Sequence, residues 1–349
     1  MAGRGVIRTS HLWRRRGVPG ERTAARRLPP MDSYRKLSKL GEGAHGLVYS
    51  AEVLPSNAQY GKMPGIVAIK KIRMRSAAEG ISQETIRELK LLQELGHPHI
   101  IRVFQVFGHR GNINVVLEQM STDLEVIINT TSIVLRPGDI KAYMRMLLSA
   151  VMHCHRNWTM HRDLKPSNCL ISVDGVLKLS DFGLAKIFGS PNAVYSPQAC
   201  TLWFRAPELL FGATSYGSPS DIWSCGCIFA QLMLRVPLFH GSTELEQLAS
   251  IFAIMGTPAE ADWPGMTALP SYVQFEARTP QPLSSIFPGV HAAALDLLQA
   301  MLTFDPAKRI TAADALAHEY FKTEPAETPP DQLPRSAPDG TKSTYERDQ

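Results

Sequence analysis

The sequence predicts an α+β protein in which a small β-rich lobe precedes a larger helical lobe, and two observations support this. Residues 34–107 hold short β-branched runs, such as 47–49 and 66–69, separated by turn residues. Further along the chain, apolar residues recur at helical spacing, for example over 140–154. The junction near Met120 should therefore form a cleft, which is a favoured place for a ligand.

The remaining elements follow from the same patterns. An amphipathic helix is expected over 82–95, because Ile86, Leu89, Leu92 and Leu95 fall about one turn apart. This helix is the only long one expected in the first lobe. Short strands are expected over 113–117, 169–171 and 177–179.

The composition is that of a soluble globular protein. The chain has 349 residues, of which 44% are hydrophobic and 20% charged, so it can bury a sizeable core. No run of about 18 apolar residues occurs, so no membrane-spanning helix and no membrane partner are expected. Five scattered cysteines favour reduced thiols, and Cys225 and Cys227 lack the second pair that a zinc site needs.

The two ends of the chain differ in composition from the part between them. Residues 1–30 hold eight arginines and one acidic residue, so their net charge is +7. Because the whole chain has a net charge of +5, the remaining residues have a net charge of about −2. That balance argues against direct nucleic-acid binding by the folded part. We interpret 1–30 as a basic extension that is either disordered or an artefact, in which case translation starts at Met31; a nuclear-localisation patch or a transit peptide are the alternatives. Residues 322–349 are predicted to be a disordered tail, because they are rich in Pro, Thr, Asp and Glu.

A glycine-rich loop follows the first predicted strand. Gly41, Gly43, Gly46 and Val48 form the pattern G-x-G-x-x-G-x-V, in which glycines let backbone N–H groups approach phosphates closely. A dinucleotide-binding fingerprint has a similar pattern, but it must open a helix. Here the loop joins two strands, which favours a nucleotide-phosphate loop of a different type.

A lysine at the end of an apolar strand points to bound anions. In the run 67–70, Ala68 precedes Lys70, and a buried ammonium without anions nearby would be costly. Nucleotide phosphates and Glu88, on the helix that follows, would supply these anions. A lysine whose ammonium simply reaches solvent at the strand end is the alternative.

Two short motifs carry the candidate chemistry. In His161-Arg162-Asp163, the carboxylate of Asp163 can orient an attacking hydroxyl, and Lys165 can neutralise charge on a moving phosphoryl group. Asp181-Phe182-Gly183 follows, and Asp181 and Asn168 supply oxygen ligands that suit magnesium. A single such tripeptide could occur by chance. The glycine-rich loop, Lys70 and these two motifs in this order and spacing could not.

Together these elements resemble the signature of protein kinases. The resemblance implies a bilobal kinase domain over 34–321, divided into 34–120 and 121–321, which uses ATP and Mg²⁺ to phosphorylate Ser or Thr. It also implies that Glu208 pairs with Arg309 and that Asp221 braces the catalytic loop. A pseudokinase that only binds partners is the alternative of another class; the presence of Lys70, Asp163 and Asp181 argues against it.

Within the kinases, the chain resembles the cyclin-dependent kinases (CDKs). Residues 79–88 are similar to their cyclin-contacting helix, and 201–208 match the end of their activation segment. Residues 132–135, 188–192 and 332–335 look like the CDK-activating kinases, the cyclin-dependent kinase seven group. That resemblance implies a cyclin, an assembly factor and a transcription-factor complex as partners. It also implies Ser/Thr-Pro substrates in CDK activation loops and the RNA polymerase II repeat, and location in nucleus and cytoplasm. Another transcriptional or cell-cycle CDK is the alternative.

The same resemblance assigns binding and regulatory residues. Glu118 and Met120 would offer backbone groups to adenine, with Leu170 beneath the base and Val48 and Ala68 completing the pocket. Ser196 occupies the place of the activating phosphosite, and Ser190 is a second candidate. Phosphate there would need cations. The expected cluster is Arg87, Arg162 and Lys186.

Several residues depart from the CDK pattern. Ala44 and His45 replace the Thr-Tyr pair of cell-cycle CDKs, so their inhibitory phosphorylation should be absent. Leu117 stands where phenylalanine is usual behind adenine, which should open the back of the pocket. Ala199 and Cys200 replace the valines that shape the pocket for the substrate proline, and Cys200 is expected to be a small wall residue rather than a redox switch.

Overall fold

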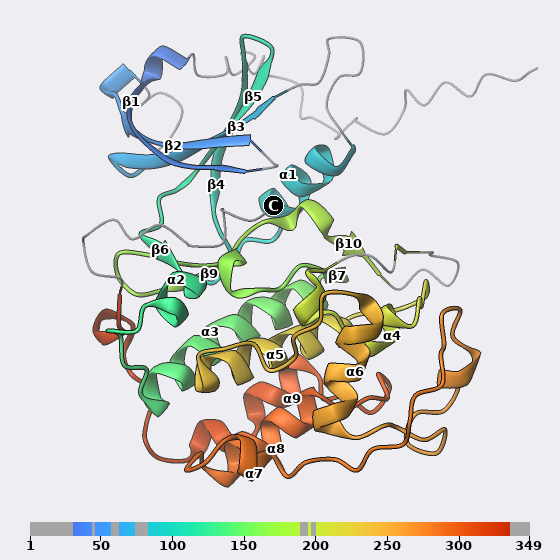
Figure 1. Cartoon of the computed structure of the whole chain (residues 1–349). Helices are drawn as coiled ribbons and strands as arrows, with labels where there is room; N and C mark the ends of the chain where they lie inside the picture. The colour runs from blue at the N-terminus through green and yellow to red at the C-terminus, as the bar shows by residue number, and fades with distance from the viewer. Residues whose placement is uncertain are drawn as a thin grey trace, which may run out of the picture.

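The computed structural model describes residues 31–43, 46–56, 63–73, 83–188, 195–196 and 200–335, and it confirms the two-lobe α+β arrangement. Figure 1 shows the β-sheet of the first lobe above the helices of the second. Some sequence-based predictions lie outside the described residues. These are the ones for residues 1–30, Ala44, His45, Ser190 and Ala199 and for the side chains of Arg87 and Glu88.

A five-stranded antiparallel sheet forms the first lobe, in the order β1-β2-β3-β5-β4. One face of the sheet packs around Tyr49, Val67, Ile69, Phe107 and Val116, which are all nearly inaccessible to solvent. The strands are β1 (Tyr34–Gly43), β2 (Gly46–Val53), β3 (Ile66–Arg73), β4 (Val103–His109) and β5 (Asn112–Glu118).

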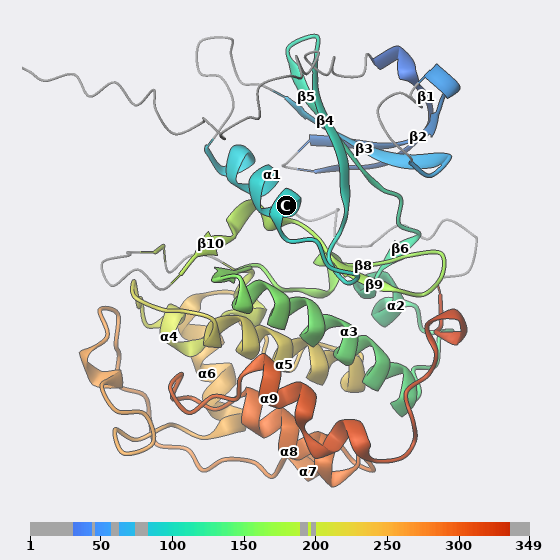
Figure 2. The same cartoon turned by 180° about the vertical axis from the view of Figure 1, so that it is seen from behind.

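Among the described residues of this lobe there is one long helix, as predicted. Helix α1 (Gln83–Glu94) lies beside the sheet and close to the 3-10 turn Phe182–Leu184 (Figure 2). Its last turn is buried through Leu91 and Leu92, which join the core of the second lobe. The helix therefore connects the sheet to the segment that begins with Asp181.

The second lobe is built around two long helices. Helix α3 (Pro137–Arg156) and helix α5 (Pro219–Leu234) pack against each other, and most residues of both are buried. Short strands above α3 flank the loops that hold the catalytic motifs (Figure 1). The other helices are α2 (Leu124–Asn129), α4 (Pro207–Leu210), α6 (Glu244–Met255), α7 (Leu283–Ile286), α8 (Ala292–Met301) and α9 (Ala312–Ala317). The short strands are β6 (Thr122–Asp123), β7 (Thr159–Met160), β8 (Cys169–Ile171), β9 (Leu177–Leu179) and β10 (Lys186–Ile187).

The predicted disordered tail is wrong for residues 323–335, which lie along α3 as an ordered strap. The buried Lys141 ammonium donates to the carbonyl oxygens of Thr323 and Pro325, the latter at 2.8 Å. The Tyr143 hydroxyl donates to the Pro334 carbonyl oxygen at 2.8 Å. The strap has few large apolar residues, so its composition resembled that of a disordered segment. Polar side chains of α3 hold it instead.

The described part of the chain was compared with the patterns of a membrane-spanning helix and of a metal-binding cluster. No helix there is long and apolar enough to cross a membrane. No three His, Cys, Asp or Glu side chains among these residues gather as they would around a metal ion, and Cys225 and Cys227 are buried free thiols.

Candidate active site

A cavity of about 520 Å³ lies between the two lobes. It brings together most of the residues that the sequence assigned to nucleotide binding, although they are up to 140 positions apart in the chain. Gly43 ends β1 opposite Gly46, and its predicted place in the lining falls outside the described residues. The predicted residues that line the cavity are Gly41, Gly46, Val48, Ala68, Lys70, Glu118, Met120, Asn168, Leu170 and Asp181.

Gly46 shows why the loop between β1 and β2 needs glycine. Its φ is +121°, a region that residues with a side chain rarely adopt. A Cβ atom at this position would lie 2.2 Å from the carbonyl oxygen of Lys71 on β3. Any other residue would therefore push the loop off the sheet and change the roof of the cavity.

Lys70 projects from β3 into the cavity. Its neighbours across the sheet are Val48 on β2 and Val115 on β5. The lysine is half-buried rather than fully buried, because its side chain lines the open cavity. Glu88 lies on α1 as predicted, but its pairing with Lys70 falls outside the described side chains and stays a prediction.

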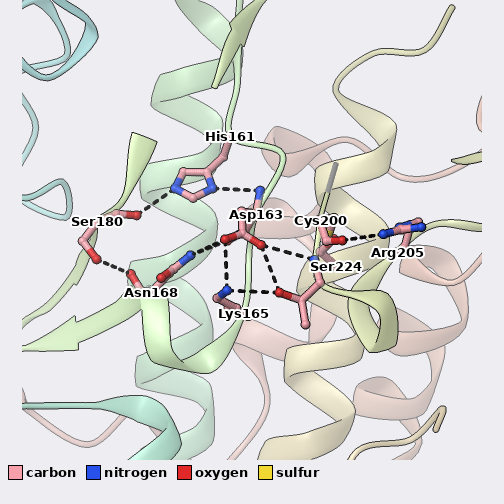
Figure 3. Close-up of polar contacts among 9 residues, drawn as sticks. His161, Asp163, Lys165, Asn168, Ser180, Cys200, Arg205 and Ser224 are labelled. Atoms are coloured by element: carbon pink, nitrogen blue, oxygen red, sulfur yellow. Dashed lines mark hydrogen bonds and ion pairs between the residues drawn. The ribbon is translucent and has the colours of Figure 1, made fainter. Parts of the chain in front are cut away.

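Asp163 is held by three side chains (Figure 3). One carboxylate oxygen accepts hydrogen bonds from the Thr201 N–H at 3.2 Å and the Thr201 hydroxyl at 3.1 Å. The other accepts from Asn168 Nδ2 at 3.0 Å and lies 3.1 Å from Lys165 Nζ. Burial would raise the pKa of Asp163, but Lys165, His161 and these hydrogen bonds outweigh it and lower the pKa. The carboxylate is therefore ionised at neutral pH.

The loop that carries Asp163 is braced from α5. The Asp221 carboxylate, 1% exposed, accepts hydrogen bonds from the backbone N–H groups of His161 and Arg162, each at 2.9 Å. It also contacts His155 Nε2 at 2.9 Å. Burial opposes ionisation of Asp221, but the hydrogen bond and charge of His155 lower its pKa overall. Asp221 thus supports the loop without facing the cavity.

Asn168 and Asp181, whose side chains both carry oxygen, line the same cavity. Asn168 directs its Nδ2 to the carboxylate and carbonyl of Asp163, at 3.0 and 2.7 Å, which leaves Oδ1 on the other side of the amide. Asp181 lines the same cavity with a left-handed backbone of φ 60°. A carboxylate and an amide oxygen are the donor types that Mg²⁺ takes from proteins, so this pair fits the predicted metal.

The back of the cavity is apolar. Leu117 lines it together with Leu92 of α1, Ile101 and Val115. That this apolar space lies behind adenine, as the replacement of phenylalanine by Leu117 implies, stays a prediction.

Ser196 is exposed, and its backbone is held next to Arg162. Its carbonyl oxygen accepts hydrogen bonds from Arg162 Nη2 at 3.2 Å and from the Tyr216 hydroxyl at 2.7 Å. Arg162 is buried, and its guanidinium lies 5.9 and 5.6 Å from the ring centres of Tyr195 and Tyr216, which pack against each other at 5.3 Å. Its Nε and Nη1 atoms find no hydrogen-bond acceptor within the described residues. Of the predicted phosphate-binding cations, Arg162 is thus beside Ser196, while Lys186 lies on β10.

Cys200 shapes the surface beyond Thr201. Its φ is 77°, and its carbonyl oxygen accepts a hydrogen bond from Arg205 Nη2 at 3.0 Å. Arg205 in turn pairs with Glu244 at 2.6 Å. Burial raises the pKa of Cys200 to about 12, so its thiol is protonated and unreactive at neutral pH.

The predicted pair of Glu208 and Arg309 is present. Arg309 donates from Nη1 and Nη2 to the two Glu208 carboxylate oxygens at 2.8 and 3.0 Å. Both residues are 4% exposed. This two-pronged pair anchors the end of the activation segment to the second lobe.

Sequence reasoning missed several contacts of this site. In the sequence, Thr201 stands out only as part of the segment 201–208, although it holds Asp163 through two hydrogen bonds. Ser50 and Gln119, which form a hydrogen bond beside the cavity, were not noted at all. Polar residues of this kind have no sequence signal of their own, because their role depends on a partner far away in the chain.

Comparisons with known proteins agree with this geometry. A model of the protein kinase domain matches residues 34–321. Cyclin-dependent kinase 7 of Dictyostelium discoideum is 48% identical over 308 residues, which cover 87% of this chain and 84% of that protein. Its namesake from Xenopus laevis is 50% identical over 305 residues, covering 86% and 85%. A chain in the structure of the CAK complex from Chaetomium thermophilum bound to ATP-gamma-S has a TM-score of 0.81 and 41% identity, with 87% and 96% coverage.

The chain therefore belongs to the protein kinase family. Within that family it is a Ser/Thr protein kinase of the cyclin-dependent kinase 7 type, the CDK-activating type, and it uses ATP.

Proposed function

We propose that this chain is the catalytic subunit of a CDK-activating complex that phosphorylates Ser or Thr followed by proline. The proposed substrates are the activation loops of other CDKs and the C-terminal repeat of RNA polymerase II. The proposal rests on one observation: the carboxylate of Asp163 is ionised and is held beside the cavity by Lys165, Asn168 and Thr201. The similarity to relatives of the cyclin-dependent kinase 7 type supports the choice of substrates.

In the proposed reaction, the hydroxyl of the substrate Ser or Thr donates a hydrogen bond to Asp163. Asp163 aims the hydroxyl oxygen at the γ-phosphate of ATP and accepts its proton as the new O–P bond forms, while the bond from the γ-phosphorus to the β–γ bridging oxygen breaks and ADP leaves. Lys165, 3.1 Å from the carboxylate, neutralises charge on the transferred group. Lys70, on the roof of the cavity, would bind the other phosphates.

Asn168 and Asp181 are the residues that would hold Mg²⁺. When bound, the ion neutralises charge on the ATP phosphates and helps to orient them. The protein's own contribution is to keep both oxygen donors at the same border of the cavity. The Asn168 amide is fixed by Asp163, so the metal site and the hydroxyl-orienting group are mechanically linked.

Adenine is proposed to lie against the segment that joins the lobes. Glu118 and Met120 would present backbone groups to its edge, with Val48 and Ala68 above the ring and Leu170 below. These residues line the cavity on opposite sides. The arrangement suits a flat apolar ring with a polar edge.

We also propose a cyclin bound against α1, an assembly factor and a transcription-factor complex as partners, and action in the nucleus and cytoplasm. The similarity of residues 79–88 to a cyclin-contacting helix and the likeness to a chain of the CAK complex support the first two. Phosphorylation of Ser196 would place a dianion beside the buried Arg162 guanidinium, whose Nε and Nη1 lack acceptors among the described residues.

The substrate proposal can be tested with the full chain, purified together with candidate cyclins. ATP-dependent phosphorylation of a CDK activation loop and of polymerase-repeat peptides should both be seen with the correct cyclin. Replacing the proline after the target residue by alanine should lower the rate of each. Bound nucleotide without transfer, under every pairing, would instead support a binding module.

A further inference from the structure

Gln119 lies in the hinge between the lobes but does not line the cavity. Its neighbours Glu118 and Met120 do. Instead, Gln119 Oε1 accepts a hydrogen bond from the Ser50 hydroxyl at 2.6 Å. Ser50 lies on β2, is 3% exposed and is 69 positions away in sequence. A buried hydroxyl on the roof strand is thus bonded directly to the hinge.

Through the sheet itself, β2 is linked to the hinge by way of two other strands. Ser50 faces Ala68 on β3, and Ala68 faces Leu117 on β5. Val48 is two positions before Ser50, so it lies on the same face of β2, and it lines the cavity. The bond therefore sets the separation between the roof of the cavity and the hinge.

The hinge is anchored elsewhere on both sides of Gln119. The Glu118 N–H donates to the Arg102 carbonyl at 3.1 Å, and the Ser121 N–H donates to the Ile171 carbonyl at 2.9 Å. Gln119 sits between the two peptide planes that carry the Glu118 C=O and the Met120 N–H. Holding its side chain limits rotation of both planes.

We propose that Ser50 and Gln119 are positioning residues for the adenine of ATP. They act by fixing the roof strand and the two hinge peptide planes relative to each other, without touching the nucleotide. This inference rests on the placement of adenine against the hinge proposed above. It predicts that the pair affects ATP affinity far more than the rate of phosphate transfer.

The test uses the cyclin-bound full chain with Ser50→Ala and Gln119→Leu. Each should raise the KM for ATP by about 3- to 10-fold, the range expected for one lost hydrogen bond, with kcat and the KM for the protein substrate nearly unchanged. The double variant should be no worse than the worse single variant, because both remove the same bond. Gln119→Glu keeps an acceptor oxygen and should restore the KM.

Tyr49→Phe is the matched control. It removes a hydroxyl from the residue just before Ser50 on the same strand, and this hydroxyl contacts Met31 Sδ at 3.6 Å. Its KM for ATP should equal that of the wild type. Equal increases of the KM for ATP in all variants, Tyr49→Phe included, would mean general loosening of β2 and would overturn the proposal. A KM for ATP that is unchanged in both Ser50→Ala and Gln119→Leu would also overturn it. A wild type that uses no ATP would instead contradict the proposed function.

Discussion

Asp221 and Arg162 are joined by a hydrogen bond from the backbone N–H of Arg162 to the Asp221 carboxylate, at 2.9 Å. The contact comes from the start of α5 and holds the catalytic loop where the Arg162 backbone has a φ of 73°. A non-glycine residue needs outside support to keep this conformation. The position of Asp163, one residue further, therefore depends on Asp221.

Asp221→Ala should accordingly lower both stability and kcat. The buried N–H groups of His161 and Arg162 lose their acceptor, so unfolding free energy should fall by at least about 2 kcal/mol. Thermal unfolding and steady-state kinetics measure the two effects. A variant with normal kcat would show that the loop keeps its shape without this brace.

Arg309→Met should destabilise the protein by about 3–5 kcal/mol, because it leaves the Glu208 carboxylate buried without its partner. Adding Glu208→Gln to this variant should restore part of the loss. Lys322→Ala is the control, since Lys322 and Glu319 form an ion pair in which both side chains are exposed. Urea unfolding compares them; similar losses in Arg309→Met and Lys322→Ala would contradict the account.

Acid should destabilise the fold through a histidine cluster beside α3. Burial, with the charges of His153, His99 and Lys178, lowers the pKa of His97 to about 4, and the rings of His97 and His153 stack at 4.8 Å. The folded state thus binds this proton less readily than the unfolded state. The stability is present above about pH 6.5 and is lost as the pH falls toward 4. Melting temperatures between pH 7.5 and 5 should fall less steeply for His97→Asn than for the wild type; parallel curves would contradict this.

The strap over 323–335 should contribute measurably to stability. Ending the chain after Lys322 removes the carbonyl acceptors of the buried Lys141 ammonium, and the melting temperature should fall by several degrees. Ending it after Arg335 keeps all these contacts and is the matched control. If both truncations melt together, the strap is not needed for the fold.

Leu117→Phe should narrow the back of the cavity. Binding of ATP analogues with a bulky group on the adenine amine should weaken by at least about tenfold in this variant, because added side-chain volume cannot be accommodated in a packed site. The KM for ATP itself should change little. Equal analogue affinity for both proteins would show that the space beside Leu117 is not used.

The sequence predicted the residues that bear the chemistry better than the contacts that hold them. Asp163, Lys165, Asn168 and Asp181 lie in short motifs, and local order in the chain is enough to find them. The Ser50–Gln119 bond joins residues far apart, and no local pattern marks either partner.

In the fold, too, features with a local sequence pattern were predicted, and contacts between distant residues were not. The lobes follow from hydrophobic periodicity, which the sequence displays directly. The ordered strap was missed, because polar contacts to Lys141 and Tyr143 replace the apolar residues that usually signal packing. Composition alone could not distinguish it from a disordered tail.

The most direct test of the account is phosphate transfer by Asp163→Asn, with ATP affinity measured on the same protein. Because Asp163 is assigned to the substrate hydroxyl and not to the nucleotide, we expect transfer to fall by about 10²- to 10⁴-fold while ATP affinity is kept. An Asp163→Asn variant that phosphorylates its substrate at the wild-type rate would contradict the central claim.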